Sequence, residues 1–149
     1  MPMRDMGENI YRVSETERLE VTEKIIAHLK GYDDVVFAYL FGSFIDQEMG
    51  YFRDIDIAVF ISDTKGGSIM AREIALANAI QEAIDYQYPV DVVVMNDKDL
   101  TLIAEIIEGD LLFTKDKDLW ADYVVDKVIR YNDMAYYRDL YIKEAYLES

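Results

Sequence analysis

The sequence predicts an α/β fold of the α+β type, in which a small mixed β-sheet packs against helices. Apolar residues make up 52% of the 149 residues, enough to form a buried core. Short apolar runs typical of buried strands alternate with longer segments whose apolar residues recur at helical spacing. Their order is helix, strand, strand, helix, strand, helix, which favours a sheet covered by helices. We expect residues 1–149 to form a single domain.

The first two elements are expected to be a helix over residues 14–30 and a strand over residues 35–41. Ser14 is followed three residues later by Glu17, which is the capping-box pattern of a helix N-terminus. Gly31 ends the run of helically spaced apolar residues. The continuous apolar run over residues 35–41 is typical of a buried strand.

The middle of the chain is expected to contain a turn, a strand, a helix and a strand. Residues 42–53 mix small and polar side chains and predict a short helical turn followed by a loop. A second strand is expected over residues 54–62 and a second long helix over residues 69–86. Pro89 then precedes a third strand over residues 90–95.

The last third of the chain predicts a helix over residues 97–108 capped by Asn96, a short strand over residues 111–113, and a long C-terminal helix over residues 116–147. The C-terminal helix carries more aromatic residues than one small core needs. They are Trp120, Tyr123, Tyr131, Tyr136, Tyr137, Tyr141 and Tyr146. Two interpretations stay open: packing on the sheet, and partner binding or homo-oligomer formation through this helix.

The chain is strongly acidic, with 30 acidic and 15 basic residues and a formal net charge of −15. A surface this negative repels a phosphate backbone, so we expect no direct binding of nucleic acid. There is no cysteine, which excludes disulfides and thiolate metal sites. No apolar stretch is long enough to span a membrane, and residues 1–8 lack the apolar run of a signal peptide. We therefore expect a cytoplasmic protein without membrane partners.

Three aspartates and a Gly-Ser pair are the candidate functional residues. Side chains alternate along a strand, so Asp54 and Asp56 are expected to point to the same face. Asp91 opens the third strand, and if that strand lies next to the second, the three carboxylates form a cluster of oxygen ligands. Hard divalent cations such as magnesium bind such clusters in phosphoryl-transfer sites. Gly42 would let the backbone approach a phosphate closely, and the Ser43 hydroxyl can donate to it.

The order Gly42-Ser43, ten residues, Asp54-Ile55-Asp56, with Asp91 downstream, resembles the signature of the DNA polymerase β-type nucleotidyltransferase superfamily. Within it, the chain is most similar to the minimal branch, the MNT-type antitoxins of HEPN/MNT toxin–antitoxin pairs. The block Val90-Asp91-Val92-Val93, the segment over residues 100–113 and the tyrosine-rich final helix are also typical of that branch.

This resemblance implies that the protein transfers AMP from ATP to a tyrosine of a HEPN ribonuclease toxin and so neutralises it. It further implies that Asp54, Asp56 and Asp91 hold two magnesium ions. Asp91 could also accept the proton of the attacking hydroxyl. Gly42 and Ser43 match the pair that binds the triphosphate.

Two alternatives remain. Family members commonly carry an Arg-Gly step shortly after the Gly-Ser pair, whereas residues 44–48 here include two acids, and Arg53 supplies the cation of that loop. This difference favours an antitoxin that inhibits the HEPN toxin by binding alone. A small-molecule nucleotidyltransferase of the antibiotic-modifying kind is a further alternative, for which we would expect an additional substrate domain.

Overall fold

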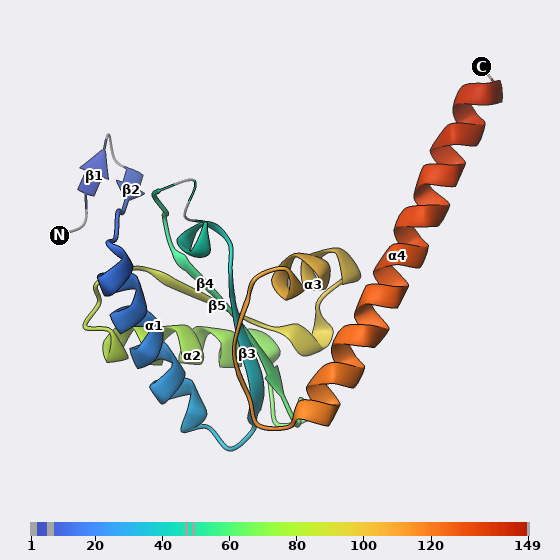
Figure 1. Cartoon of the computed structure of the whole chain (residues 1–149). Helices are drawn as coiled ribbons and strands as arrows, with labels where there is room; N and C mark the ends of the chain where they lie inside the picture. Colours follow the sequence, from blue (N-terminus) through green and yellow to red (C-terminus); the bar gives the residue numbers. More distant parts are fainter. Residues whose placement is uncertain (1–2, 6–7, 47, 49, 149) are drawn as a thin grey trace.

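The computed structural model describes residues 3–5, 8–46, 48 and 50–148. Its main feature is a four-stranded sheet with helices on both faces (Figure 1). The strands are β3 (Val35–Phe41), β4 (Ile55–Ile61), β5 (Val90–Val94) and β6 (Asp110–Thr114), in the order β5-β4-β3-β6. β3 is antiparallel to β4 and β6, while β4 and β5 are parallel. The predicted mixed sheet is therefore confirmed.

One face of the sheet is covered by α1 (Glu15–Lys30) and α2 (Ile69–Ala83). The capping box at the start of α1 is confirmed, because the Glu17 backbone N–H donates to Ser14 Oγ over 3.1 Å. α2 ends three residues before the predicted position. Asp85 and Tyr86 both have φ of 56°, a left-handed conformation that cannot continue the helix.

The other face is covered by α3 (Leu100–Ile107) and by the beginning of α4 (Lys117–Glu148). Trp120 Nε1 donates to the Tyr39 hydroxyl over 2.7 Å, and the Tyr123 ring lies 5.4 Å from the Phe37 ring. These contacts attach the first turns of α4 to β3. The remainder of α4, coloured orange to red, extends away from the sheet (Figure 1). No helix in the described part of the chain has the length and apolarity needed to cross a membrane.

The predicted N-terminal cap of α3 and the predicted start of that helix were wrong. Asn96 does not cap α3, because it lies in a 3-10 turn (Met95–Asp97) and bonds the backbone of Ile61. Its Oδ1 accepts from Ile61 N–H at 3.0 Å, and its Nδ2 donates to Ile61 O at 2.8 Å. Asp99 caps α3 instead, accepting from the Leu102 N–H at 2.9 Å. The helix therefore begins three residues later than expected.

The structure also contains a hairpin at the N-terminus that the sequence analysis did not predict. It is formed by β1 (Met3–Asp5) and β2 (Glu8–Ile10), which pair antiparallel. Tyr11 follows and exchanges two backbone hydrogen bonds with Phe52, of 2.8 and 3.0 Å. This bridge ties the chain before α1 to the loop that leads into β4.

Candidate active site

The parallel pairing of β4 and β5 brings the three predicted aspartates together. Asp56 lies directly opposite Asp91 in the register, and Asp54 is one residue before β4 instead of inside it. One carboxylate oxygen from each of the three residues lies within 4.8 Å of the other two. Asp54 and Asp56 are half-buried and Asp91 is exposed, so the cluster is open to solution on one side.

The alternation of side chains along β4 explains why Asp56 faces this cluster. Ile55 and Ile57 have no exposed surface and pack in the core beneath α1 and α2. Asp56 must then point to the opposite face, which is the face of α3. In a parallel register its neighbour Asp91 points the same way, and Val90 and Val92 are buried beside the two isoleucines.

The cluster is electrostatically unfavourable without a cation. Burial, followed by the charges of Asp54, Asp91 and Glu105, raises the pKa of Asp56 to about 7. Burial and the charge of Asp91 also raise the pKa of Asp54. Glu105 belongs to α3, so this helix borders the site. Sequence reasoning missed Glu105, because nothing in the spacing places α3 beside β4.

Gly42 lies directly against the Asp56 carboxylate of this cluster. It has φ of +80°, a conformation that favours glycine, and a Cβ built on it would collide with the Asp56 carboxylate. Ser43 follows as the first residue of a 3-10 turn (Ser43–Ile45) and is half-buried. Phe44 fixes that turn, because its ring is fully buried with its centroid 4.9 Å from that of Phe52. The Gly-Ser turn is therefore held at the end of β3, next to Asp56.

A groove of about 350 Å³ lies along β5, on the side of the sheet that α2 covers. It lies between α2 and β5, and Asp91 is one of its lining residues. The helical spacing of Ile74 in the sequence matches that of the buried residues of α2. In the structure, however, Ile74 is not buried: it is 56% exposed and lines this groove. The exposure arises because α2 packs through the neighbouring ridge of Leu76 and Ile80, which are buried.

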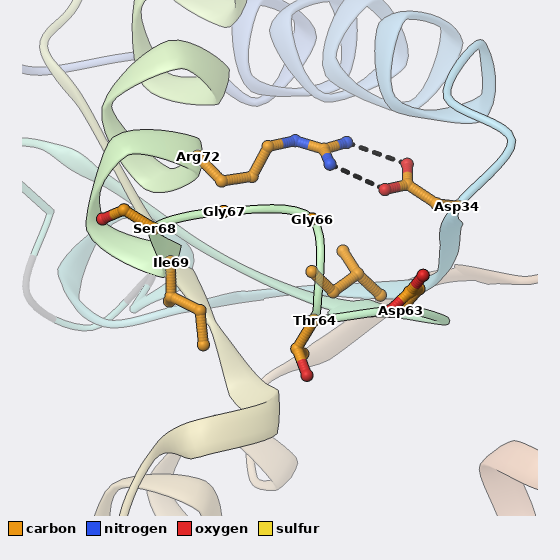
Figure 2. Close-up of a pocket in the computed structure, with 9 residues that line it drawn as sticks. Asp34, Asp63, Thr64, Gly66, Gly67, Ser68, Ile69 and Arg72 are labelled. Atoms are coloured by element: carbon orange, nitrogen blue, oxygen red, sulfur yellow. Dashed lines mark hydrogen bonds and ion pairs between the residues drawn. The ribbon is translucent and has the colours of Figure 1, made fainter.

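A second pocket lies at the opposite end of β4 (Figure 2). It is bounded by the Gly66-Gly67 loop and by Arg72, whose guanidinium donates to both Asp34 carboxylate oxygens over 2.6 and 2.8 Å. β4 spans seven residues, so roughly 20 Å separates this pocket from the aspartate cluster. The charge of Arg72 is already neutralised by Asp34, and none of the three aspartates lines the pocket.

The mixed sheet, the Gly-Ser turn and the paired aspartates together define a domain of the polymerase β-like nucleotidyltransferase class. The family model described as "Polymerase beta, Nucleotidyltransferase" matches residues 23–118, from within α1 to the start of α4. This is more than half of the chain, and the protein belongs to that family.

Solved structures of toxin–antitoxin complexes are similar to this chain. One is described as the tri-AMPylated HEPN toxin of Shewanella oneidensis in complex with MNT antitoxin; its matching chain is 25% identical, with a TM-score of 0.63 and coverage of 86% of this chain and 98% of that chain. A toxin–antitoxin complex with AMP-PNP matches at 27% identity and a TM-score of 0.64, covering 83% and 97%. The MntA–HepT complex matches at 25% identity and 0.62, covering 85% and 97%. Among curated proteins, none matches this chain. The resemblance to MNT-type antitoxins is thus confirmed.

Proposed function

We propose that this protein is a magnesium-dependent protein adenylyltransferase that acts as an antitoxin, transferring AMP from ATP to a tyrosine of a HEPN ribonuclease toxin. The observation that carries the proposal is the convergence of Asp54, Asp56 and Asp91 within 4.8 Å, directly beside Gly42. Two further findings support it: a similar complex contains an AMPylated HEPN toxin, and another contains the ATP analogue AMP-PNP. The proposed location is the cytoplasm, where ATP is available.

The aspartate cluster fits a divalent cation. Its donors are carboxylate oxygens, which hard cations such as magnesium prefer. Burial, and after it the charges of neighbouring acids, raises the pKa values of Asp54 and Asp56, and a bound cation would offset the cost of keeping both carboxylates ionised. We assign Asp54, Asp56 and Asp91 as the ligands of two magnesium ions. When bound, such ions stabilise the negative charge that develops on the phosphoryl group during transfer.

The Gly-Ser turn and Asp91 supply the remaining functions. Backbone N–H groups at the start of the turn and the Ser43 hydroxyl would donate hydrogen bonds to the triphosphate, as phosphate-binding turns do. Asp91 would accept the proton of the tyrosine hydroxyl. The tyrosine oxygen forms a bond to the α-phosphorus of ATP, and the bond from that phosphorus to the bridging oxygen breaks. The bridging oxygen keeps the electron pair, and the products are an AMP–tyrosine ester and pyrophosphate.

Inhibition by binding alone is the second candidate function, and the exposed end of α4 favours it. Tyr136, Tyr137, Tyr141 and Tyr146 are each more than 60% exposed on the part of α4 that extends from the sheet. Tyrosine is enriched in protein interfaces because it is large, rigid and able to donate hydrogen bonds. This surface could hold the toxin, or a second copy of the chain, without any chemistry at the aspartates.

The two functions are separated by intact-mass spectrometry of the HEPN toxin that we propose as the partner of this protein. Incubation of the toxin with the pure protein, ATP and magnesium is expected to add adenylyl groups to the toxin and to abolish its ribonuclease activity. Asp56→Asn is expected to prevent both changes. If the toxin is inhibited at unchanged mass by wild type and by Asp56→Asn alike, the protein acts by binding alone.

A further inference from the structure

The helix α4 has two apolar sides: one packs on the rest of the described chain, and the other is exposed. Val124, Lys127 and Tyr131 are half-buried, and the last two line a cavity of about 160 Å³ between α3 and α4. Because each residue turns a helix by about 100°, four large apolar side chains lie on the side that faces away from α3. This outer stripe consists of Val125, Ile129, Tyr136 and Leu140. Their exposed fractions are 57%, 55%, 63% and 41%.

The spacing of the outer stripe is the same when it is read from either end. The intervals between its members are four, seven and four residues, and the midpoint falls between Asn132 and Asp133. If a second copy of α4 is laid against the first in the opposite direction, Val125 faces Leu140 of the copy. Ile129 then faces Tyr136 of the copy. A two-fold interface requires this self-complementarity, because each contact between two residues occurs twice.

Asn132 lies at the edge of the outer stripe, next to its midpoint, and is exposed. In an antiparallel pair of helices it would meet Asn132 of the second copy beside the two-fold axis. An amide can both donate and accept a hydrogen bond, so two such side chains can bond each other. A single asparagine within an apolar helix interface is known to fix the register of the pair. Asn132 would therefore hold the two copies at the register that the stripe requires.

The segment that carries the outer stripe is electrically neutral, although the protein is strongly acidic. Residues 125–140 contain three acidic and three basic residues, so the whole formal net charge of −15 lies elsewhere in the chain. They are Asp126, Asp133 and Asp139, and Lys127, Arg130 and Arg138. A neutral apolar surface does not repel a second copy of itself, and it has no field that would attract a basic protein. The charges thus favour a copy of this chain as the occupant of the stripe.

The antiparallel direction also keeps the two acidic domains apart. Trp120, which attaches α4 to β3, lies about 12 residues before the midpoint of the stripe, so the two attachment points would be roughly 37 Å apart. This separation exceeds the Debye length of about 8 Å at physiological ionic strength, and the repulsion between the domains is largely screened. A parallel pair would place the two domains side by side.

We propose that the outer stripe of α4 is the interface of a homodimer, in which two copies of this chain pair through antiparallel α4 helices. Tyr137 and Tyr141 lie on a different side of α4 and stay exposed in this dimer, so another protein can still bind them. The inference does not depend on the proposed adenylyltransferase function, because it uses no residue of the aspartate cluster.

The first test is analytical ultracentrifugation of the pure protein, without toxin, at concentrations from roughly 1 to 100 µM. Wild type should pass from monomer to dimer over this range. Ile129→Asp and Leu140→Asp should each raise the dissociation constant of the dimer at least tenfold, because each places two carboxylates in the interface. Met70→Asp on α2 is the matched control, since Met70 is 69% exposed, and should dimerise like wild type. All variants should give the wild-type circular dichroism spectrum at the lowest concentration.

Cysteine substitutions test the direction of the pair, since the natural chain contains no cysteine. Under oxidising conditions, a mixture of Val125→Cys and Leu140→Cys should form the mixed disulfide dimer, because these positions face each other. Asn132→Cys should form a disulfide with its own copy. Val125→Cys alone should remain largely monomeric on a non-reducing gel. If it links to itself as readily as the mixture does, the helices are parallel and the proposed dimer is wrong.

A wild-type protein that stays monomeric up to the highest concentration would overturn the proposal. So would a dimer that persists unchanged in both Ile129→Asp and Leu140→Asp. Calorimetry with the HEPN toxin then shows whether the toxin occupies the stripe instead. A toxin affinity that falls for Ile129→Asp but not for Met70→Asp would assign the outer stripe to the toxin.

Discussion

The carboxylate of Asp56 lies where a methyl group on Gly42 would have to be. Gly42 directly follows β3, Asp56 lies on the adjacent antiparallel strand β4, and Phe41, the residue before Gly42, is the register partner of Asp56. This contact fixes the distance between the proposed phosphate-binding turn and a proposed metal ligand. Gly42 is therefore needed for two independent reasons, its left-handed backbone and the space that it leaves.

Replacing Gly42 by alanine should damage both stability and activity. The strained backbone should cost about 1–2 kcal/mol in free energy of unfolding, and displacement of Asp56 should lower the rate of AMP transfer about a hundredfold. Gly66→Ala is the matched control, because nothing lies within 4 Å of a Cβ at that position. Chemical denaturation and the transfer assay measure the two effects. If Gly42→Ala behaves like Gly66→Ala, the contact with Asp56 has no consequence.

The raised pKa of Asp56 predicts an unusual pH dependence of the metal-free protein. The pKa is 3.8 for an ordinary aspartate and about 7 in the folded protein. Between these values the folded state binds more protons than the unfolded state, so the free energy of unfolding should fall as pH rises from about 4 to 7. Asp56→Asn should remove this fall and stabilise the metal-free protein at pH 8 by about 1 kcal/mol, after allowance for solvent screening at this partly exposed site.

Denaturation in the presence of a chelator, at several pH values, measures this difference. Asp122→Asn on α4 serves as the control, because Asp122 is exposed and far along the chain from the cluster. Added magnesium should reduce the advantage of Asp56→Asn, since a bound cation compensates the charge of the native aspartate. An Asp56→Asn protein that is less stable than wild type at pH 8 without metal would contradict the prediction.

The ion pair between Asp34 and Arg72 should have the opposite pH dependence. The side-chain hydrogen bonds from Arg72 hold the pKa of Asp34 below its ordinary value. The stabilisation is present above the ordinary aspartate pKa and is lost as pH falls through the lower, folded-state value. Asp34→Asn should therefore cost roughly 0.5–1 kcal/mol at pH 7 and progressively less below pH 3.8. AMP transfer should be unchanged, because this pair lies at the other end of β4; a large loss of activity would show otherwise.

The hydrogen bond from Trp120 to Tyr39 should anchor the beginning of α4. Trp120→Phe and Tyr39→Phe should each lower the free energy of unfolding by about 1 kcal/mol. Because both remove the same bond, the double variant should cost less than the sum of the two single variants. Thermal denaturation of the four proteins completes this cycle. Strictly additive losses would mean that the bond does not contribute to holding α4 on the sheet.

Much of the fold could be predicted because each strong pattern has a local cause. The facing of Asp56 follows from the two-residue period of β4, whereas Asp54 lies in the bend just before that strand. The start of α1 follows from the Ser14 cap. The pairing of Asp56 with Asp91 could not be derived from spacing, because strand order and register depend on contacts across the whole sheet. Asn96 shows the same limit, since its amide satisfies both backbone groups of Ile61 and leaves the cap of α3 to Asp99.

The side chains of Gln81 and Glu73 on α2 accept hydrogen bonds from the Val90 and Val94 N–H groups of β5, and this has a consequence for the behaviour of the protein in solution. Residues 90–94 read Val-Asp-Val-Val-Val, a sequence that readily forms intermolecular β-structure when its edge is free. These two side chains occupy N–H groups that another molecule would otherwise bind. A protein lacking both should therefore fail first by aggregation, at concentrations and temperatures where its helices are still folded.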